Sequence, residues 1–499
     1  MAHHITSTPT GASLHAPSPT ASSGLAILRC LGALVFIEAS GFIINASVYA
    51  RMAEFFAVGR EIATLAGALM FAALAVVALR RPALMNARAL TTGAVVLSLA
   101  GAALSGAGLL LESSFVVLAG LLCRAAASVW ATALFSVALC TLSSSRDVLL
   151  VAGGGTLLAH IGCAFAPAAW PPSAACAALA LCVLVPIALT AKLAGPSLAA
   201  IGQSGADDGD GLGDIKGFVP LAALLLCVLL TAVAYGYALA FNQQNNAPIV
   251  TFAENFIVAA AFAMVLVDKS QKSEDRLFSL VVLLVVAGYL MAPYELASAE
   301  GATNALLRAG RDCFSMLLWI LLAFIGRRNL FVLLPMVGLV RASSSLGTDI
   351  GALAGHLTNF LTASSAPLAG LFPSIMVFCF VAFLWLGFRR FSFTEAVSEV
   401  KLVTAPDIER LGNRIDSACL VLSKQHGLTP RETEILTLLA KGRDGKFIAE
   451  KYVLSYQTVK THIKHLYAKL GVHSRQELIN LTDQTIADAA RGPQPRRNA

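Results

Sequence analysis

Two stretches decide the fold of the C-terminal end: Gly427-Leu-Thr-Pro-Arg-Glu-Thr-Glu-Ile-Leu436 and Ser455-Tyr-Gln-Thr-Val-Lys-Thr-His-Ile-Lys-His-Leu-Tyr-Ala-Lys-Leu-Gly471. In the first, Thr429 stands directly before Pro430 and three residues before Glu432. This order is a capping box with proline at the first helical position, so we expect a helix to begin here. Its buried face would be formed by Ile435, Leu436, Leu438 and Leu439.

The second stretch predicts a helix with two unlike faces. A short helix is expected over roughly Lys446–Tyr452, and Ser455 is placed to cap the helix that follows. One face of this next helix is an apolar stripe at i, i+4, i+7 and i+11: Val459, Ile463, Leu466 and Leu470. The opposite face is small, polar and basic: Gln457, Lys460, Thr461, Lys464 and Ala468. Such a face suits the major groove of DNA, which admits an α-helix. Ser474-Arg-Gln-Glu477 is a further capping box and predicts a fourth helix.

These residues carry a family resemblance. The segment from about Gly427 to Leu481 resembles the DNA-binding domain of LuxR-family regulators, through LTPRETEIL, IAE, S-x-x-TVKTH and KLGV followed by Ser474-Arg475. The resemblance implies that Lys460, Thr461 and Lys464 enter the groove. It also implies that Ser455, Thr458 and Lys446 lie near phosphates, and with Gln457 these residues form the predicted DNA-binding set.

The charge of this segment agrees with a nucleic-acid partner. From Lys424 to Asn480 there are ten Lys or Arg and five Asp or Glu, so the segment carries 10 − 5 = +5. Phosphate contacts give a salt-dependent affinity, whereas contacts to base edges select the sequence. Double-stranded DNA is therefore the expected partner, and dimerisation on it follows from the resemblance.

Composition places most of the chain in a bilayer. The 499 residues are 57% hydrophobic and only 13% charged, with a mean hydropathy of +0.74. Soluble domains have roughly 25% charged residues. The ten cysteines include no C-x-x-C pair and lie almost entirely in apolar runs, so neither a metal site nor a disulfide framework is expected. No cofactor is expected either.

Twelve apolar runs are each long enough to span the hydrocarbon core. The first six lie near 26–49, 60–79, 89–111, 115–140, 148–167 and 174–195, and the next six near 218–241, 249–267, 277–297, 305–325, 329–357 and 368–388. We therefore divide the chain into a disordered tail (1–24), transmembrane helices 1–6 (25–195), a polar cytoplasmic linker (196–217), transmembrane helices 7–12 (218–390), a connector with an amphipathic helix (391–426), the helix-turn-helix domain (427–482) and a disordered tail (483–499).

The loop charges predict the orientation. With the N-terminus in the cytoplasm, the inner loops and the end of the last span hold thirteen Arg or Lys, against at most three in the outer loops: Arg51, Arg60 and Arg308. The excess of positive charge inside predicts that both termini, and with them the helix-turn-helix domain, are cytoplasmic in a bacterial inner membrane.

The layout of six plus six spans around a polar linker resembles the major facilitator superfamily over about residues 25–390. The predicted fold class is thus all-α: a polytopic, major-facilitator-like bundle of 12 transmembrane helices plus a C-terminal four-helix LuxR-type helix-turn-helix domain. The loop between spans two and three, Leu79-Arg-Arg-Pro-Ala-Leu-Met-Asn-Ala-Arg88, lacks the family's signature with glycine and aspartate. Because that signature belongs to the gating of working transporters, its absence favours a role other than transport.

Polar groups inside spans are costly and usually face the interior of the bundle. The candidate ligand-binding residues are Glu38, Asn45, Arg124, His160, Arg311, Asp312 and Arg341; Glu61, Glu254, Asp349 and His356 lie nearer the span ends. One interpretation is a polar cavity between the two six-helix halves that binds a small molecule. The other is a set of ion pairs that lock the bundle, for example Glu38 with Arg124 or Asp312 with Arg341. The chain also resembles membrane-embedded LuxR-type regulators with a twelve-span sensor, which act on genes for handling small organic compounds, and this resemblance implies a small organic or aromatic ligand.

The connector carries apolar residues at 408, 411, 415, 418 and 422, a helical stripe that could pack on its own chain or on a second copy. No hydrolase, metalloprotease or nucleotide-binding motif is found, so we do not expect an enzyme. The expected function is a membrane-embedded, one-component transcriptional regulator that senses a small molecule. The alternatives are a solute transporter with an attached DNA-binding domain, and a bundle that serves only as an anchor.

Overall fold

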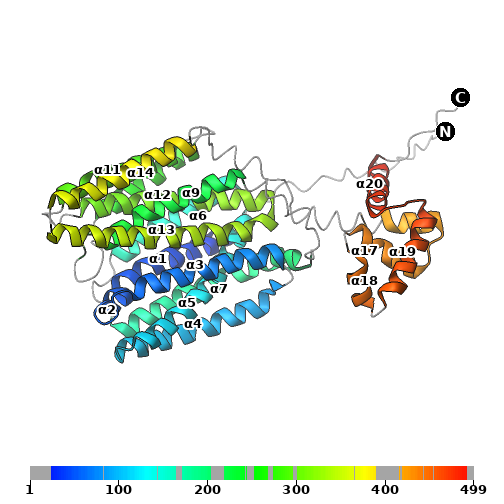
Figure 1. The fold of residues 1–499 in the computed structure, drawn as a ribbon, viewed down its shortest axis with the longest axis horizontal. Coiled ribbons are helices and arrows are strands. Elements are labelled where there is room, and N and C mark those ends of the chain that lie inside the picture. The colour runs from blue at the N-terminus through cyan, green and yellow to red at the C-terminus, as the bar shows by residue number, and fades with distance from the viewer. Residues whose placement is uncertain are drawn as a thin grey trace, which may run out of the picture.

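The computed structural model describes residues 24–81, 84–142, 144–164, 171–203, 219–241, 243, 252–267, 273–295, 301–364, 366–388, 415, 418–441, 443–452 and 455–491. Within these residues the regular elements are helices, with no strand. They form a large bundle and a smaller C-terminal unit (Figure 1). Each has its own hydrophobic core.

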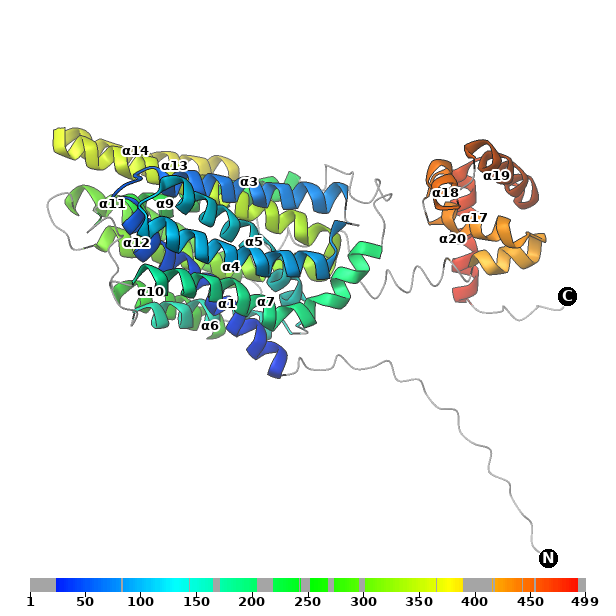
Figure 2. The same cartoon turned by 90° about the horizontal axis from the view of Figure 1, so that it is seen from below.

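The first half of the bundle matches the first six predicted spans. Its helices are α1 (Gly24–Ile43), α3 (Gly59–Arg80), α4 (Ala87–Leu110), α5 (Ser114–Cys140), α6 (Ser145–Ala164) and α7 (Pro172–Gln203). A π-helical turn, η1 (Ile44–Val48), joins α1 to the short α2 (Tyr49–Met52), so the first span is continuous. Helix α4 is packed along α5, while α1 lies against α6 and α7 (Figure 2).

The second half matches the other six spans. Its helices are α9 (Val219–Ala240), α10 (Phe252–Val267), α11 (Ser273–Glu295), α12 (Ala302–Arg328), α13 (Leu330–Ser364) and α14 (Ala366–Phe388). Helix α13 stays unbroken despite Arg341, three serines and Asp349. Nine helices among the described residues are long and apolar enough to cross a membrane, and α10 and part of α14 are shorter apolar helices. The bundle is therefore that of a multi-pass membrane protein.

Two close approaches hold the bundle together. The halves meet where α3 packs along α13, and where α6 contacts α10 and α12.

Within the second half, α9 and α13 touch through backbone at Gly236, Gly347, Gly351 and Gly355. A Cβ at Gly351 would lie 1.9 Å from the carbonyl oxygen of Val233, so only glycine permits this spacing. Small residues at four-residue intervals are typical of such helix pairs in membranes.

The C-terminal unit contains α17 (Pro430–Ala440), α18 (Gly445–Tyr452), α19 (Tyr456–Leu470) and α20 (Arg475–Arg491). They enclose a core that includes Leu436, Ile448, Leu466 and Leu478. Of the predicted connector stripe, Ile415, Ala418 and Leu422 lie within the described residues; Leu422 and its neighbour Cys419 are in this core, and Ile415 is packed against it. This part of the connector therefore packs on its own chain.

Two predicted boundaries are wrong. The polar linker was expected from residue 196, but α7 continues to Gln203 because Leu198 and Ile201 are buried in the bundle core. The disordered tail was expected from residue 483, but α20 continues to Arg491. Alanines at 487, 489 and 490 favour this continuation because alanine has the highest helix propensity. The rest of both segments, and the tail 1–23, lie outside the described residues.

Candidate DNA-binding face and intramembrane charge cluster

Local sequence positions α19. The hydroxyl of Ser455 accepts a hydrogen bond from the backbone N–H of Thr458 at 3.0 Å, as its predicted capping role requires. The helix ends at Gly471, whose φ of 70° lies in the left-handed region that glycine adopts without strain. The cap at Ser455 and the left-handed glycine at Gly471 therefore set the first and last residues of α19.

The two faces of α19 are as predicted. Val459, Leu466 and Leu470 are buried, and Ile463 packs against the same core. The polar face is exposed along the whole helix: Gln457, Lys460, Thr461, Lys464 and Ala468. Ser455 and Thr458 are exposed at its N-terminal end, which is where helix N–H groups attract phosphate. Lys446 lies in α18, and its side chain is outside the described residues. Six of the seven predicted DNA-binding residues thus share one accessible surface.

A buried carboxylate ties α17 to α19. Glu432 accepts hydrogen bonds from the backbone N–H of Thr429 (2.8 Å) and from the ammonium of Lys469 (2.7 Å), and its own N–H is bonded to the Thr429 hydroxyl (3.2 Å). The capping box predicted from the sequence is therefore complete. The Lys469 hydrogen bond, followed by those from Thr429, lowers the pKa of Glu432 from 4.5 to about 2. Lys469 is near the C-terminal end of α19, so this pair helps to orient that helix.

Inside the bundle, a row of charged and hydrogen-bonding side chains lies on one face of α12. Arg308, Arg311 with Asp312, Ser315 and Trp319 follow one another at three- or four-residue intervals, so they lie on one side of the helix. Arg308 and Asp312 are buried, although the bundle around them is apolar. Charges in such a place persist only when they are paired.

Glu38 of α1 joins this face across the two halves. Its carboxylate accepts hydrogen bonds from Ser315 (2.9 Å), from the indole N–H of Trp319 (3.1 Å) and from Arg311 (3.2 Å). Arg311 also donates to Asp312 at 2.7 Å, and its guanidinium lies over the ring of Tyr235. A single acid of the first half thus receives three donors from the second half.

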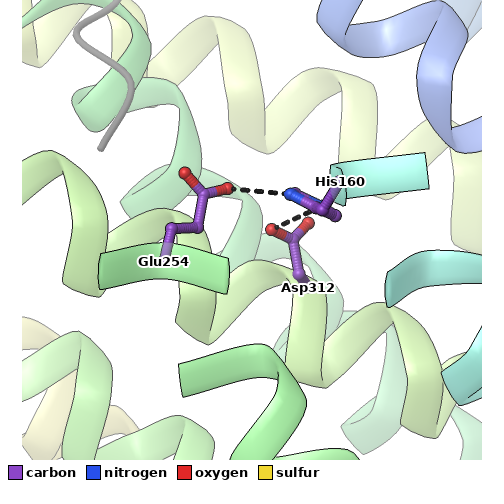
Figure 3. Close-up of side chains that lie close together, drawn as sticks. All are labelled: His160, Glu254 and Asp312. Atoms are coloured by element: carbon purple, nitrogen blue, oxygen red, sulfur yellow. Dashed lines mark ion pairs between the residues drawn. The ribbon is translucent and has the colours of Figure 1, made fainter. Parts of the chain in front are cut away.

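His160 of α6 lies between two further carboxylates (Figure 3). Its Nδ1 is 3.4 Å from Glu254 of α10, and its Nε2 is 3.1 Å from Asp312. Glu254 is in turn paired with Arg308 at 3.1 Å. An imidazole donates from both nitrogens only when protonated, so one proton changes the charge of this cluster.

The same three residues have the spacing of a metal site. Donor atoms of His160, Glu254 and Asp312 all lie within 4.8 Å of one another. However, Arg308 already pairs with Glu254, and Arg311 pairs with Asp312, so a divalent cation would lie beside two guanidinium charges. We therefore interpret the group as an ion-pair network.

The structure brings together only part of the predicted ligand-binding set. Glu38, His160, Arg311 and Asp312 meet in one network, and Arg341 lies beside it, with its guanidinium 4.6 Å from the centre of the Trp319 ring. Arg124 is elsewhere: its guanidinium lies 3.4 Å from the Ser40 hydroxyl. Asn45 is in the π-helical turn and donates to the carbonyl oxygen of Gly41 at 2.8 Å. The expected pairs of Glu38 with Arg124 and of Asp312 with Arg341 are wrong, because Arg311 is nearer to both acids.

Sequence reasoning missed two members of the network. Arg308 lies at the start of the predicted span 305–325 and was counted, at most, among the outer-loop charges, but α12 begins at Ala302, so Arg308 is in its second turn and buried. Glu254 was assigned to a span end where water reaches, but it is buried. The signal was present for Arg308, since its spacing from Arg311, Asp312 and Ser315 is helical. No comparable pattern marks Glu254.

Two small cavities flank Arg311. One lies among α1, α6, α9 and α12 and includes Glu38, His160, Tyr235, Arg308 and Asp312 in its wall. The other lies among α9, α12 and α13 and includes Thr231, Ser315, Trp319, Arg341 and Ser344. The first cavity has a volume of about 20 Å³ and the second a volume of about 30 Å³, where volume means the space that the centre of a water molecule can occupy. The centre of the bundle is therefore polar and leaves little free space.

Fold and site together define a multi-pass membrane protein with a helix-turn-helix unit at its C-terminal end. Residues 426–482 match the family model described as "Bacterial regulatory proteins, luxR family". Similar curated proteins include the "Oxygen regulatory protein NreC" of Staphylococcus aureus strains JH9 and JH1, each 36% identical over 96 residues. That match covers 19% of this chain and 44% of the relative, so less than half of the relative is matched. The C-terminal unit is therefore a LuxR-type DNA-binding domain.

Solved structures similar to the chain include major facilitator transporters. The proton:xylose symporter XylE is 14% identical, with 78% of this chain and 98% of that chain covered and a TM-score of 0.48. The human organic anion transporter MFSD10 is 14% identical, with 71% and 99% covered and a TM-score of 0.40. The E. coli fucose:proton symporter FucP is 15% identical, with 72% and 97% covered and a TM-score of 0.39. The predicted all-helical fold class, a membrane bundle followed by a LuxR-type domain, is confirmed.

Proposed function

We propose that this protein is a one-component transcriptional regulator whose membrane bundle senses a small molecule and whose LuxR-type domain binds the target DNA. Sensing and DNA binding would then reside in one chain, with both termini in the cytoplasm of a bacterial cell. The loop charges support this orientation, since thirteen basic residues fall on one side by sequence. Dimerisation on DNA is part of the proposal.

One observation carries the sensing role: a polar network spans the two halves at the centre of the bundle. Glu38 of α1 is held by Arg311, Ser315 and Trp319 of α12. His160 of α6 joins the same α12 to α10 through Asp312 and Glu254. An anchor requires neither twelve helices nor buried charges, which are costly in a membrane. A network at the junction of two halves is suited to respond when they move.

The proposed mechanism is a population shift. A ligand that binds better to one arrangement of the halves increases the population of that arrangement, whereas equal affinity for both has no effect. The segment between α14 and the LuxR-type domain would transmit the change. The readout would be altered dimerisation of the domain or altered access of the exposed α19 face to DNA.

Transcript profiling tests the proposal. Hosts carrying the wild-type chain, Lys464→Ala or Glu38→Gln are compared across a panel of small organic compounds. We expect a compound-dependent change in a few genes in the wild type, which both variants lose. Purified Lys464→Ala should bind its operator about 1–3 kcal/mol more weakly if the lysine contacts a base edge, with little change on random DNA. Glu38→Gln should leave DNA binding by the 391–499 fragment unchanged, because that fragment lacks residue 38.

Two outcomes would contradict the proposal. If transcripts stayed constant while vesicles containing the protein accumulated a compound, the bundle would be a transporter. If the 391–499 fragment regulated its genes with the same compound dependence as the full chain, the bundle would not be the sensor.

A further inference from the structure

The cavity among α9, α12 and α13 has a positively charged wall with no carboxylate. Its polar lining consists of Arg311, Arg341, Ser315, Ser344, Thr231 and the indole of Trp319. The rest of the lining is apolar, mainly Val228, Phe314, Leu318, Leu322 and Val340. Two guanidinium groups, the Ser344 hydroxyl and apolar walls are complementary to a compound with one anionic end and an apolar body. The hydroxyls of Ser315 and Thr231 already donate within the protein, to Glu38 and to backbone carbonyl oxygens of α9.

Arg341 distinguishes this cavity from the neighbouring network. Arg308 and Arg311 are each paired with a carboxylate. Among the described residues no carboxylate lies within ion-pair distance of Arg341, whose guanidinium instead lies over the Trp319 ring at 4.6 Å. The nearest acid that acts on Arg341 is Glu38, from beyond ion-pair distance. A cation in a membrane interior without an anion in contact is costly, and an anionic ligand would reduce that cost.

We propose that this cavity binds a small organic carboxylate, with Arg341 holding the carboxylate group. Ser344 donates a further hydrogen bond, and the apolar body packs along Leu318, Leu322 and Val340. This inference rests on the proposed sensing function only for its regulatory meaning; the binding site itself stands on the cavity. It names the chemical class of the ligand.

The position of Trp319 connects this site to the junction of the halves. The same indole that lies against Arg341 donates its N–H to Glu38 of α1. If Arg341 moves towards a ligand carboxylate, its contact with Trp319 changes. The hydrogen bond from Trp319 of α12 to Glu38 of α1 changes with it. The present cavity has a volume of only about 30 Å³, enough for a few water molecules, so a ligand of the size of benzoate must separate the surrounding helices. Binding therefore favours a more open arrangement.

The test measures binding by the purified full-length chain in lipid nanodiscs at pH 7.5, without DNA. The probes are benzoate and hexanoate, each compared with its uncharged amide. Saturable binding is followed by tryptophan fluorescence and by the shift in thermal unfolding temperature. We expect both acids to bind and raise the unfolding temperature, and their amides to bind about ten-fold or more weakly.

Variants separate charge from packing. Arg341→Gln should lose affinity for the acids by about ten-fold or more, and Arg341→Lys should fall between it and the wild type. Ser344→Leu fills the cavity with Arg341 intact and should also abolish binding. Arg88→Gln, which removes an exposed arginine at the start of α4, is the matched control and should bind as the wild type does. Size-exclusion chromatography and circular dichroism verify that each variant is folded.

Three results would overturn the inference: equal binding of acids and amides, wild-type affinity in folded Arg341→Gln, or no saturable binding of either acid. Failure of the sensing function looks different. If the acids bind but no transcript changes, the binding site is supported and the sensing function is refuted. If a neutral compound changes transcripts and Arg341→Gln does not abolish this response, sensing is supported and this site is refuted.

Discussion

Replacing Lys469 by methionine should destabilise the LuxR-type domain without touching its DNA-binding face. The substitution keeps most of the apolar stem and removes the ammonium that donates to Glu432 at 2.7 Å. Glu432 has only 6% of its side chain exposed, so it cannot replace this donor fully with water. Its remaining donor from another residue is the backbone N–H of Thr429.

The size of the effect follows from this geometry. A hydrogen bond to a charged group contributes about 1.5–3 kcal/mol. Lys469 is 37% exposed, so solvent screening places the expected loss near the lower end, at about 1.5–2 kcal/mol. In a domain of this size each kcal/mol lowers the unfolding temperature by roughly 4–8 °C, which gives a drop of about 10 °C.

The assay is thermal and urea unfolding of the 391–499 fragment at a series of pH values. The pKa of Glu432 is lower in the folded domain, about 2 against 4.5, so the carboxylate contributes stability above pH 4.5 and loses it as the pH falls from 4.5 towards 2. The difference between wild type and Lys469→Met should therefore be full at pH 7 and shrink across that window.

Lys464→Met is the matched control, since it makes the same charge change on the exposed face of the same helix. Its stability should stay within about 0.5 kcal/mol of the wild type, although its DNA binding falls. Equal stability of Lys469→Met and wild type at pH 7, or a difference that persists unchanged at pH 2, would refute the reasoning.

Three further predictions concern other parts of the chain. Ser455→Ala should cost the 391–499 fragment about 1 kcal/mol in urea unfolding, because the N-terminus of α19 loses its cap; no loss would mean that another group replaces the cap. Gly351→Ala should destabilise the bundle by about 1–3 kcal/mol in detergent, since its Cβ would overlap α9; Gly67→Ala, where the space is open, is the control, and equal thermal unfolding would contradict the close packing. Arg308→Met should destabilise the bundle by roughly 3–5 kcal/mol by leaving Glu254 without its arginine, and an unfolding temperature equal to that of Arg88→Met would refute the pairing.

Much of the C-terminal domain could be predicted because its signals are local. The capping box at Thr429 and Glu432 and the cap at Ser455 are each read from residues three apart. The amphipathic pattern of α19 needs only the helical period to separate Val459 and Leu466 from Lys460 and Lys464. The predicted ends of α7 and α20 are wrong. Polar residues suggested that both helices end earlier, but core packing extends α7 and the helix propensity of alanine extends α20.

The partners of the intramembrane charges could not be predicted in the same way. The sequence marks Glu38 and Arg311 as costly in a span, but 273 residues separate them along the chain. Several arginines in the spans could pair with Glu38 or Asp312, and the expected pairs of Glu38 with Arg124 and of Asp312 with Arg341 are wrong. Glu254 and Arg308 were missed because both lie near the ends of their predicted spans, where depth in the bundle depends on neighbouring helices.

The sequence by itself determined the class of the fold, the presence of many membrane-spanning helices, the LuxR-type domain and the two faces of its third helix. These features follow from hydropathy and helical period, which act over neighbouring residues. Only the tertiary structure decided that Glu38, His160, Asp312 and Glu254 form one network, that Arg341 is left beside a cavity, and that Lys469 supports Glu432. The physical reason is that a buried charge is stabilised by whichever opposite charge packing brings within a few ångströms, and distance along the chain does not encode that contact.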